Sequence, residues 1–208
     1  MELFLLYGYE FLCVFLPFLT AFFLFRSFQR RTGRNLSKTA YAVSFLFASY
    51  LFGVYMVTGA GTLFDGLTRH WEIRPDRIHL IPFSDGFDLF SDSLNLLLFI
   101  PFGFLVPLLW KQMNRFIYTT AAGFSFSLLI ELSQLLNNRY TDINDLIINT
   151  LGTMLGFLLY RLWHRHTTGT DHADGLAWIE LPVYLVVTFA GHFLLFYELG
   201  FAGLLYGF

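Results

Sequence analysis

The sequence predicts an all-α, polytopic membrane protein. Of its 208 residues, 56% are hydrophobic, 20% are aromatic and only 13% are charged, whereas soluble domains carry about 25% charged residues. The mean hydropathy is +0.57. Apolar runs of about 17–25 residues, long enough to cross a bilayer, occur six times. We therefore expect six transmembrane helices within a single transmembrane domain that spans residues 1–208.

The first apolar run is interpreted as a retained span and not as a signal peptide. It lacks a basic N-terminal region and a small-residue cleavage site, and it contains Glu10. The single cysteine, Cys13, lies in the same run and excludes an internal disulfide framework. The six predicted spans cover residues 3–25, 39–60, 94–110, 116–137, 142–163 and 178–206.

The orientation follows from Lys and Arg, which are in excess in cytoplasmic loops. One side of the predicted topology carries nine of them, in loop 26–38, in loop 111–115 and at the end of the fifth span. The other side carries four, namely Arg69, Arg74, Arg77 and Arg139. We therefore expect the richer side to face the cytoplasm and both termini to lie outside.

Two connections are long enough to consider separately. Loop 61–93, expected outside, mixes polar, apolar and acidic–aromatic stretches. It is predicted either to cap a cavity or dip into the interface, or to lie on the headgroups as an amphipathic connector. Loop 164–177 contains three histidines at loose spacing and is interpreted as a solvated linker.

Polar residues recur on one face of each helix of a predicted hairpin at residues 116–163. At 100° per residue, five residues of the first helix share a narrow face, and so do five of the second. The short connecting turn makes the helices antiparallel neighbours, so the two faces are expected to meet or to line one cavity. The residues are Gly123, Ser127, Glu131, Gln134 and Asn138, then Asp142, Asp145, Asn149, Gly152 and Gly156.

Ionisable groups inside a membrane are costly, by about 2.5–3.5 kcal/mol or more each at a helix centre, and they are usually functional. The third predicted span adds Asn95 to the same side, and Glu10 and Glu198 fall in the outer halves of the first and last spans. We expect these groups to converge on one chamber that is open to the outside. Because acids outnumber cations there, the chamber would contain protonated carboxyls, or it would hold a cation or a cationic ligand group.

Structural roles compete with this interpretation. Asp142 is better explained as a helix N-cap, with Thr141 as the other candidate. Arg139 could pair with Glu131 or Asp145 and hold the hairpin together. Glu10 and Glu198 could each simply reach the membrane interface.

The runs RIHLIPF, NLLLFIPFGFLVPLLW and SLLIELSQLLNNRYTDINDLIINTLGTMLGFLLY resemble the VanZ-like family of bacterial membrane proteins, over about residues 77–160. His79 stands where the family pattern has Asn. The resemblance implies a plasma-membrane location and a link to resistance against glycopeptides, particularly the lipid-tailed teicoplanin, but no established reaction. The family positions carried over to this sequence are Arg77, Pro82, Asn95, Pro101, Gly103, Glu131, Gln134, Arg139, Asp142, Asp145, Asn149 and Gly152.

Three functions are compatible with these observations. The first is binding of a lipid-linked wall precursor or a lipoglycopeptide in the chamber, which would contribute to resistance or envelope homeostasis. The second is an intramembrane hydrolase or transferase in which Glu131 or Asp145 acts as general acid or base; the third and least favoured is a small transporter. No cofactor, metal site or nucleic-acid partner is expected. The predicted ligand-binding residues are Arg77, Asn95, Glu131, Gln134, Arg139, Asp142, Asp145 and Asn149.

Overall fold

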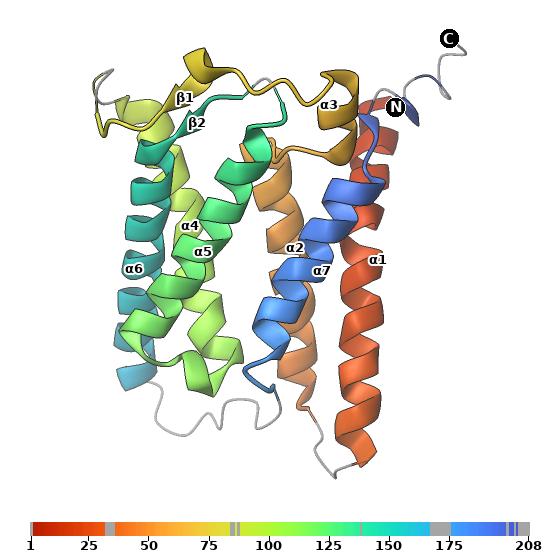
Figure 1. Cartoon of the computed structure of the whole chain (residues 1–208). Helices are drawn as coiled ribbons and strands as arrows, with labels where there is room; N and C mark the ends of the chain where they lie inside the picture. The colour runs from red at the N-terminus through yellow and green to blue at the C-terminus, as the bar shows by residue number, and fades with distance from the viewer. Residues whose placement is uncertain are drawn as a thin grey trace.

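The computed structural model describes residues 2–31, 36–83, 86, 88–137, 139–166, 176–198, 200, 201 and 203. Five helices in this part of the chain are long and apolar enough to cross a membrane, and a sixth, of 16 residues, is shorter (Figure 1). At 1.5 Å per residue the sixth spans about 24 Å, against a hydrocarbon thickness of about 30 Å. The helices are α1 (Glu2–Arg31), α2 (Lys38–Thr58), α4 (Leu89–Leu109), α5 (Phe116–Gln134), α6 (Ile143–His166) and α7 (Glu180–Leu195).

The remaining elements are short and lie at the ends of the bundle. The end that carries α3 (Leu63–Thr68) and two strands, β1 (Ile78–His79) and β2 (Thr141–Asp142), is called the β end below (Figure 1). The strands pair in parallel, with Ile78 opposite Thr141. Loop 61–93 therefore folds across the β end and is anchored to the α5–α6 turn. Short 3-10 helices also occur, η1 (Pro75–Arg77) before β1 and η2 (Lys111–Met113) between α4 and α5.

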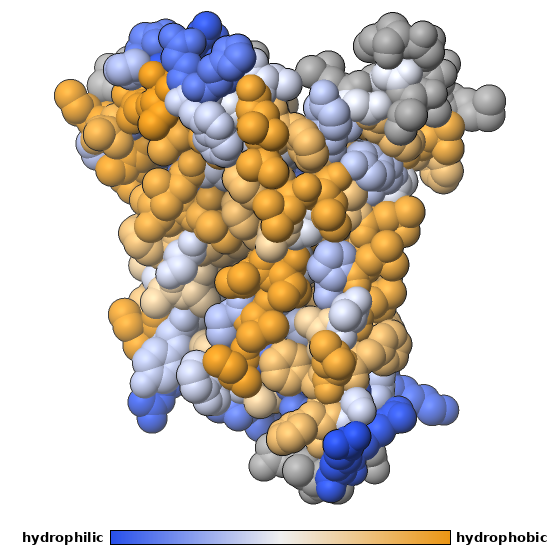
Figure 2. All heavy atoms as spheres, turned by 45° about the vertical axis from the view of Figure 1, so that its right-hand side comes forward, coloured by the Kyte–Doolittle hydropathy of each residue, from blue (hydrophilic) through white to orange (hydrophobic). Residues whose placement is uncertain are grey.

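The molecular surface has the polarity expected of a membrane protein. In the space-filling view, hydrophobic residues cover the middle of the visible face and hydrophilic residues gather at its two ends (Figure 2). Large apolar side chains in the helices are turned outward, among them Leu24, Leu97 and Val186, each at least half exposed. Such surface is stable when lipid covers it. The chain is thus an all-α, multi-pass membrane protein.

Helices α4 and α6 pack most closely, and glycines allow it. A Cβ atom on Gly103 would overlap the carbonyl of Thr153, and one on Gly156 would overlap the carbonyl of Ile100. The small pair Gly152 and Gly156 therefore serves the contact with α4, whereas Gly123 of α5 faces the side chain of Thr153. Helix α6 packs against both α4 and α5, as small residues at close helix crossings permit.

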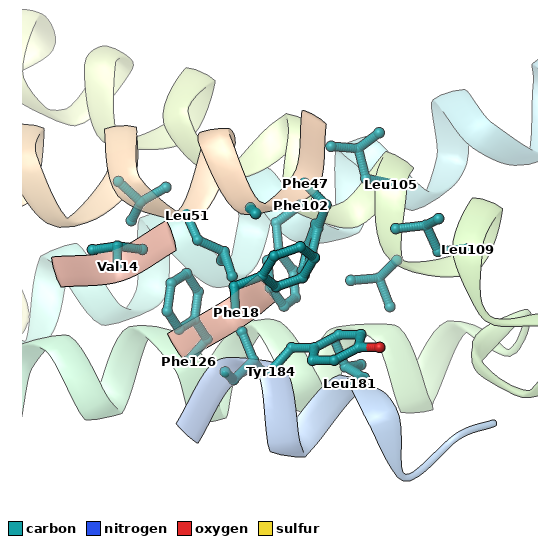
Figure 3. Packing of buried hydrophobic residues seen from close by; sticks show 14 of the residues in the cluster. Val14, Phe18, Phe47, Leu51, Phe102, Leu105, Leu109, Phe126, Leu181 and Tyr184 are labelled. Carbon is teal, nitrogen blue, oxygen red and sulfur yellow. The ribbon is translucent and has the colours of Figure 1, made fainter. Parts of the chain in front are cut away.

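The interior of the bundle is filled by aromatic and branched side chains. Phe18 of α1, Phe47 and Leu51 of α2, Phe102 of α4 and Phe126 of α5 are at most 1% exposed (Figure 3). The Phe102 and Phe126 rings stack with centroids 5.3 Å apart. This core joins all the long helices except α6, which is attached to it through α4 and α5.

The helix ends differ from the predicted spans where a side chain caps the helix or contacts another helix. Helix α1 continues six residues beyond 25 because Arg26 and Gln29 lie on its buried face. Both contact the Glu180 carboxylate, Arg26 by an ion pair and Gln29 by a hydrogen bond of 2.6 Å. Helix α4 starts at Leu89 because the Asp88 side chain accepts from the N–H groups of Phe90 and Ser91. Helix α7 ends at Leu195, so the predicted span 178–206 was too long.

Candidate functional site

Hydrogen bonds between side chains hold together a polar cluster at the β end of α4, α5 and α6. Asn95 of α4 donates from Nδ2 to Asp145 Oδ1 of α6 at 2.7 Å. Asn149, one turn further along α6, donates from Nδ2 to Ser127 Oγ of α5 at 2.9 Å. Asn95, Ser127, Glu131, Asp145 and Asn149 are called the acid–amide cluster. The predicted meeting of the α5 and α6 polar faces is confirmed, and Asn95 joins it from α4.

Glu131 lies under the start of α6. Its Oε2 accepts the backbone N–H of Asp142 at 3.0 Å, and its backbone carbonyl accepts the Thr141 hydroxyl at 3.3 Å. Asp142 caps α6, because its Oδ1 accepts the N–H of Asn144 at 2.8 Å. The N-cap role expected of Asp142 is therefore confirmed. His79 lies beside it, with Nδ1 3.8 Å from Asp142 Oδ2.

Four carboxyl groups lie in or next to the acid–amide cluster. Those of Glu131, Asp142 and Asp145 are close enough to interact electrostatically, and Asp92 of α4 adds a fourth. Glu131 and Asp92 are only 4% and 8% exposed. Within the described ranges, however, no three Asp, Glu, His or Cys side chains are grouped so that they could hold a metal ion. The arrangement is suited to hydrogen-bond donors and cationic groups.

The cluster is shallower than the sequence suggested. Helix α5 ends at Gln134 and not at 137, so Glu131 lies three residues, about 4.5 Å, from the helix end. Asn95 and Asn149 each follow the start of their helix by six residues, about 9 Å. The cluster therefore occupies roughly the first third of the bundle at the β end.

Arg77, Gln134 and Arg139 lie beside the cluster and line one small cleft with Ile78 and Thr141. Arg77 places its guanidinium over the Tyr140 ring, 5.6 Å from the centroid. Gln134 donates from Nε2 to the Thr58 carbonyl at 2.8 Å. The guanidinium of Arg139 lies against Gly59, and one of its nitrogens is 3.5 Å from the Val57 carbonyl oxygen. Arg139 therefore contacts α2 and its C-terminal cap, and it does not form the ion pair with Glu131 or Asp145 that was considered as its structural role.

A second polar zone lies on the other side of Arg139. This α1–α2–α7 cavity has a volume of about 450 Å³, and α3 forms one of its walls. Glu10, Glu198 and Arg139 line it, whereas Asn95, Glu131 and Asp145 do not. The polar groups expected in one chamber are thus divided between two zones that share Arg139. Asn138, also expected on the polar face, lies outside the described residues.

Sequence reasoning missed several polar groups. Asp92 precedes Asn95 by three residues and so lies on the same helix face, a signal that was available. His192 of α7 lines the α1–α2–α7 cavity, but it stands alone in an apolar run and has no sequence pattern around it. The Glu180 network at the opposite end includes Tyr184, whose hydroxyl donates to Glu180 Oε2 at 2.6 Å. It joins residues more than 150 positions apart, and local patterns do not reveal such pairs.

These features define the class of protein: a multi-pass helical membrane protein with a buried, hydrogen-bonded cluster of acids and amides at one end of the bundle. The sequence model of the VanZ/LLP1 family matches residues 11–164, and the chain belongs to this family.

A curated relative, Protein VanZ of Enterococcus faecium, is 34% identical over 90 residues. That alignment covers 43% of this chain and 55% of the relative, so the chain spans about half the length of the relative it matches. No solved structure has significant similarity to the chain.

Proposed function

We propose that this chain is a protein of the bacterial plasma membrane that binds the polar part of an envelope amphiphile at its β end. The ligand would be a lipid-linked wall precursor or a lipoglycopeptide. Binding would contribute to glycopeptide resistance of the teicoplanin type, or to envelope homeostasis. The relative's printed name, Protein VanZ, and the family match support this biological setting.

The observation that carries the proposal is the hydrogen-bonded convergence of three helices on the acid–amide cluster. Charged and amide side chains inside a hydrophobic bundle lower its stability, and such groups usually mark a functional site. Two buried acceptors, Gln134 Oε1 and Asn149 Oδ1, have no hydrogen-bond partner within the described part of the chain. Buried acceptors of this kind are ordinarily satisfied, so they favour a bound group that donates hydrogen bonds.

The distribution of Lys and Arg supports the location. The β end carries Arg69, Arg74, Arg77 and Arg139, and eight further Lys and Arg residues of the described chain belong to the opposite end. With the opposite end in the cytoplasm, the acid–amide cluster would lie within the outer leaflet. Lipid-linked wall precursors and lipid-tailed antibiotics occupy that leaflet with their polar parts outside.

The test compares wild type with Glu131→Gln and Asn95→Ala in a glycopeptide-susceptible Gram-positive host. Glu72→Gln, a change of an exposed acid in loop 61–93, is the matched control. We expect wild type and the control to raise the inhibitory concentration of teicoplanin, and both cluster variants to lose the increase at equal protein levels. Purified wild type should also bind a lipid-linked precursor or lipoglycopeptide saturably. The proposal fails if Glu131→Gln leaves resistance unchanged and wild type shows no saturable binding.

A second candidate is an intramembrane hydrolase or transferase that acts on an envelope lipid. It is favoured by one observation: the Glu131 and Asp145 carboxylates are partly or fully buried and close enough to influence each other. Paired acids in different environments are suited to general acid–base catalysis. Incubation of an envelope lipid extract with the protein should then convert one species, as seen by mass spectrometry, and Glu131→Ala should abolish the change. Binding without any converted species favours the first candidate.

A further inference from the structure

The α1–α2–α7 cavity contains a buried imidazole with one nitrogen unused. His192 is 2% exposed, and its Nε2 lies 3.0 Å from the Ala60 carbonyl oxygen. A carbonyl can only accept, so Nε2 carries the proton, and in a neutral ring Nδ1 is an acceptor. Within the part of the chain that the structure describes, Nδ1 has no hydrogen-bond partner. One of the residues that line the cavity therefore carries an unused, buried acceptor.

A second acceptor lies next to the first. Glu10 is 5% exposed, and its Oε1 is 3.6 Å from His192 Nδ1. Glu198 lines the same cavity and is close enough for its charge to act on Glu10. One donor group placed next to both atoms would satisfy the imidazole nitrogen and the carboxylate together. A primary ammonium group offers three N–H donors and a positive charge on one atom, and it satisfies both.

The cavity lining also includes cations. Arg69, the C-cap residue of α3, and Arg139 both line it. Within the described ranges neither guanidinium forms an ion pair. The paired N–H donors of a guanidinium are suited to bidentate hydrogen bonds with phosphate oxygens. Apolar and aromatic side chains also line the cavity. They include Leu6 and Met56, and the rings of Phe64 and Tyr197 stack with centroids 4.2 Å apart.

We propose that the α1–α2–α7 cavity binds a zwitterionic headgroup in which a primary amine is joined to a phosphate. The ammonium would lie against Glu10 and His192, the phosphate against Arg69 and Arg139, and any acyl chain along Leu6 and Met56. A volume of about 450 Å³ is within the usual range for small-ligand sites. This site is separate from the acid–amide cluster and shares no residue with it.

The first experiment varies the ligand and keeps the wild-type protein. Full-length protein in a non-ionic detergent is titrated calorimetrically with short-chain phosphatidylethanolamine, its N-acetylated analogue and short-chain phosphatidylglycerol. Charge-assisted hydrogen bonds predict at least about 10-fold weaker binding when the amine is blocked or absent. Free phosphoethanolamine forms a further arm: binding as tight as the lipid assigns the site to a soluble aminophosphate, and weaker binding assigns it to the lipid. Equal affinity for the amine and its N-acetylated form overturns the proposal.

The second experiment varies the protein. Glu10→Gln and His192→Gln should each reduce affinity for the amine ligand about 10-fold or more and reduce the preference over the acetylated analogue. Arg69→Gln should weaken binding of both ligands and leave that preference in place, and Glu72→Gln should change neither. If Glu10→Gln still binds the amine ligand and prefers it over the acetylated analogue as strongly as wild type does, the ammonium assignment is contradicted. Failure here leaves the proposed function standing, because its own test uses Glu131 and Asn95, which lie outside this cavity.

Discussion

Asn95 and Asp145 join α4 to α6 through a hydrogen bond of 2.7 Å between Nδ2 and Oδ1. The bond lies at the β end, about two turns of α6 before Gly152, which approaches the Leu96 carbonyl of α4. The polar contact and the glycine contact therefore act on the same pair of helices. The first supplies a specific register, and the second allows the backbones to approach.

Asn95→Ala should destabilise the bundle, because it removes the donor and leaves the Asp145 carboxylate with one hydrogen bond fewer. Side-chain hydrogen bonds in membrane proteins contribute about 0.6 kcal/mol on average and bonds to charged groups about 1.5–3. We expect a loss of about 1–2 kcal/mol in the free energy of unfolding, measured by denaturant titration in detergent. Asn95→Asp should lose more unfolding free energy than Asn95→Ala, because it places a further acid beside Asp145. Asn95→Asp as stable as wild type would contradict the role assigned to the amide.

At the end of the bundle opposite the β end, an ion pair between Arg26 and Glu180 joins α1 to α7. Arg26 is 4% exposed and Glu180 0%, so removal of one partner leaves a buried charge, at about 3–5 kcal/mol. Arg26→Met should therefore unfold far more readily than wild type. The double variant Arg26→Met with Glu180→Leu should recover much of the loss.

The matched control for the ion pair is Arg30→Met, which changes an exposed arginine one turn further along α1. Surface charges contribute roughly 0–1 kcal/mol, so this variant should have nearly the wild-type stability. Equal losses of unfolding free energy in Arg26→Met and Arg30→Met would show that the ion pair contributes no more to stability than any arginine on α1.

Hydropathy was sufficient to predict the long helices, because lipid exposure requires continuous apolar runs. Their ends depend on individual distant contacts. The end of α1 depends on Glu180, 154 residues from Arg26. The start of α4 depends on the Asp88 side chain, an N-cap that lies within the acidic part of loop 61–93. No local pattern contains the first of these contacts, and the second was present but not recognised.

The acid–amide cluster was predictable because helical periodicity acts within one hairpin. Ser127 and Glu131 share a face of α5, Asp145 and Asn149 share a face of α6, and a short turn makes the two helices neighbours. The place of Glu10 was not predictable in this way. Periodicity gives the face of each helix but not the order of helices around the bundle, and α1 packs on α7 and α2, away from α6.

Gly156→Ala should separate α4 from α6. The added Cβ would overlap the Ile100 carbonyl of α4, which is backbone and cannot rotate away. Forced overpacking usually costs about 1–3 kcal/mol, so the thermal midpoint should fall. Gly53→Ala is the matched control: a Cβ there meets nothing within 4 Å, and the helix preference for Ala over Gly, about 0.8–1.0 kcal/mol, should make it neutral or slightly stabilising. A similar fall of the thermal midpoint in both variants would show that Gly156 is not needed for the close approach of α4 and α6.

The orientation of the bundle can be tested by chemical labelling of single cysteines. Glu72→Cys at the β end and Arg165→Cys at the opposite end both change exposed residues, in a background where Cys13 is replaced by Ala. If Lys and Arg direct the topology, a membrane-impermeant maleimide should label Cys at 72 on intact cells and Cys at 165 only after permeabilisation. The unmodified chain is the control, because Cys13 is 5% exposed and should react with neither treatment. Labelling of position 165 on intact cells would place the acid–amide cluster in the cytoplasmic leaflet, where an external glycopeptide could not reach it.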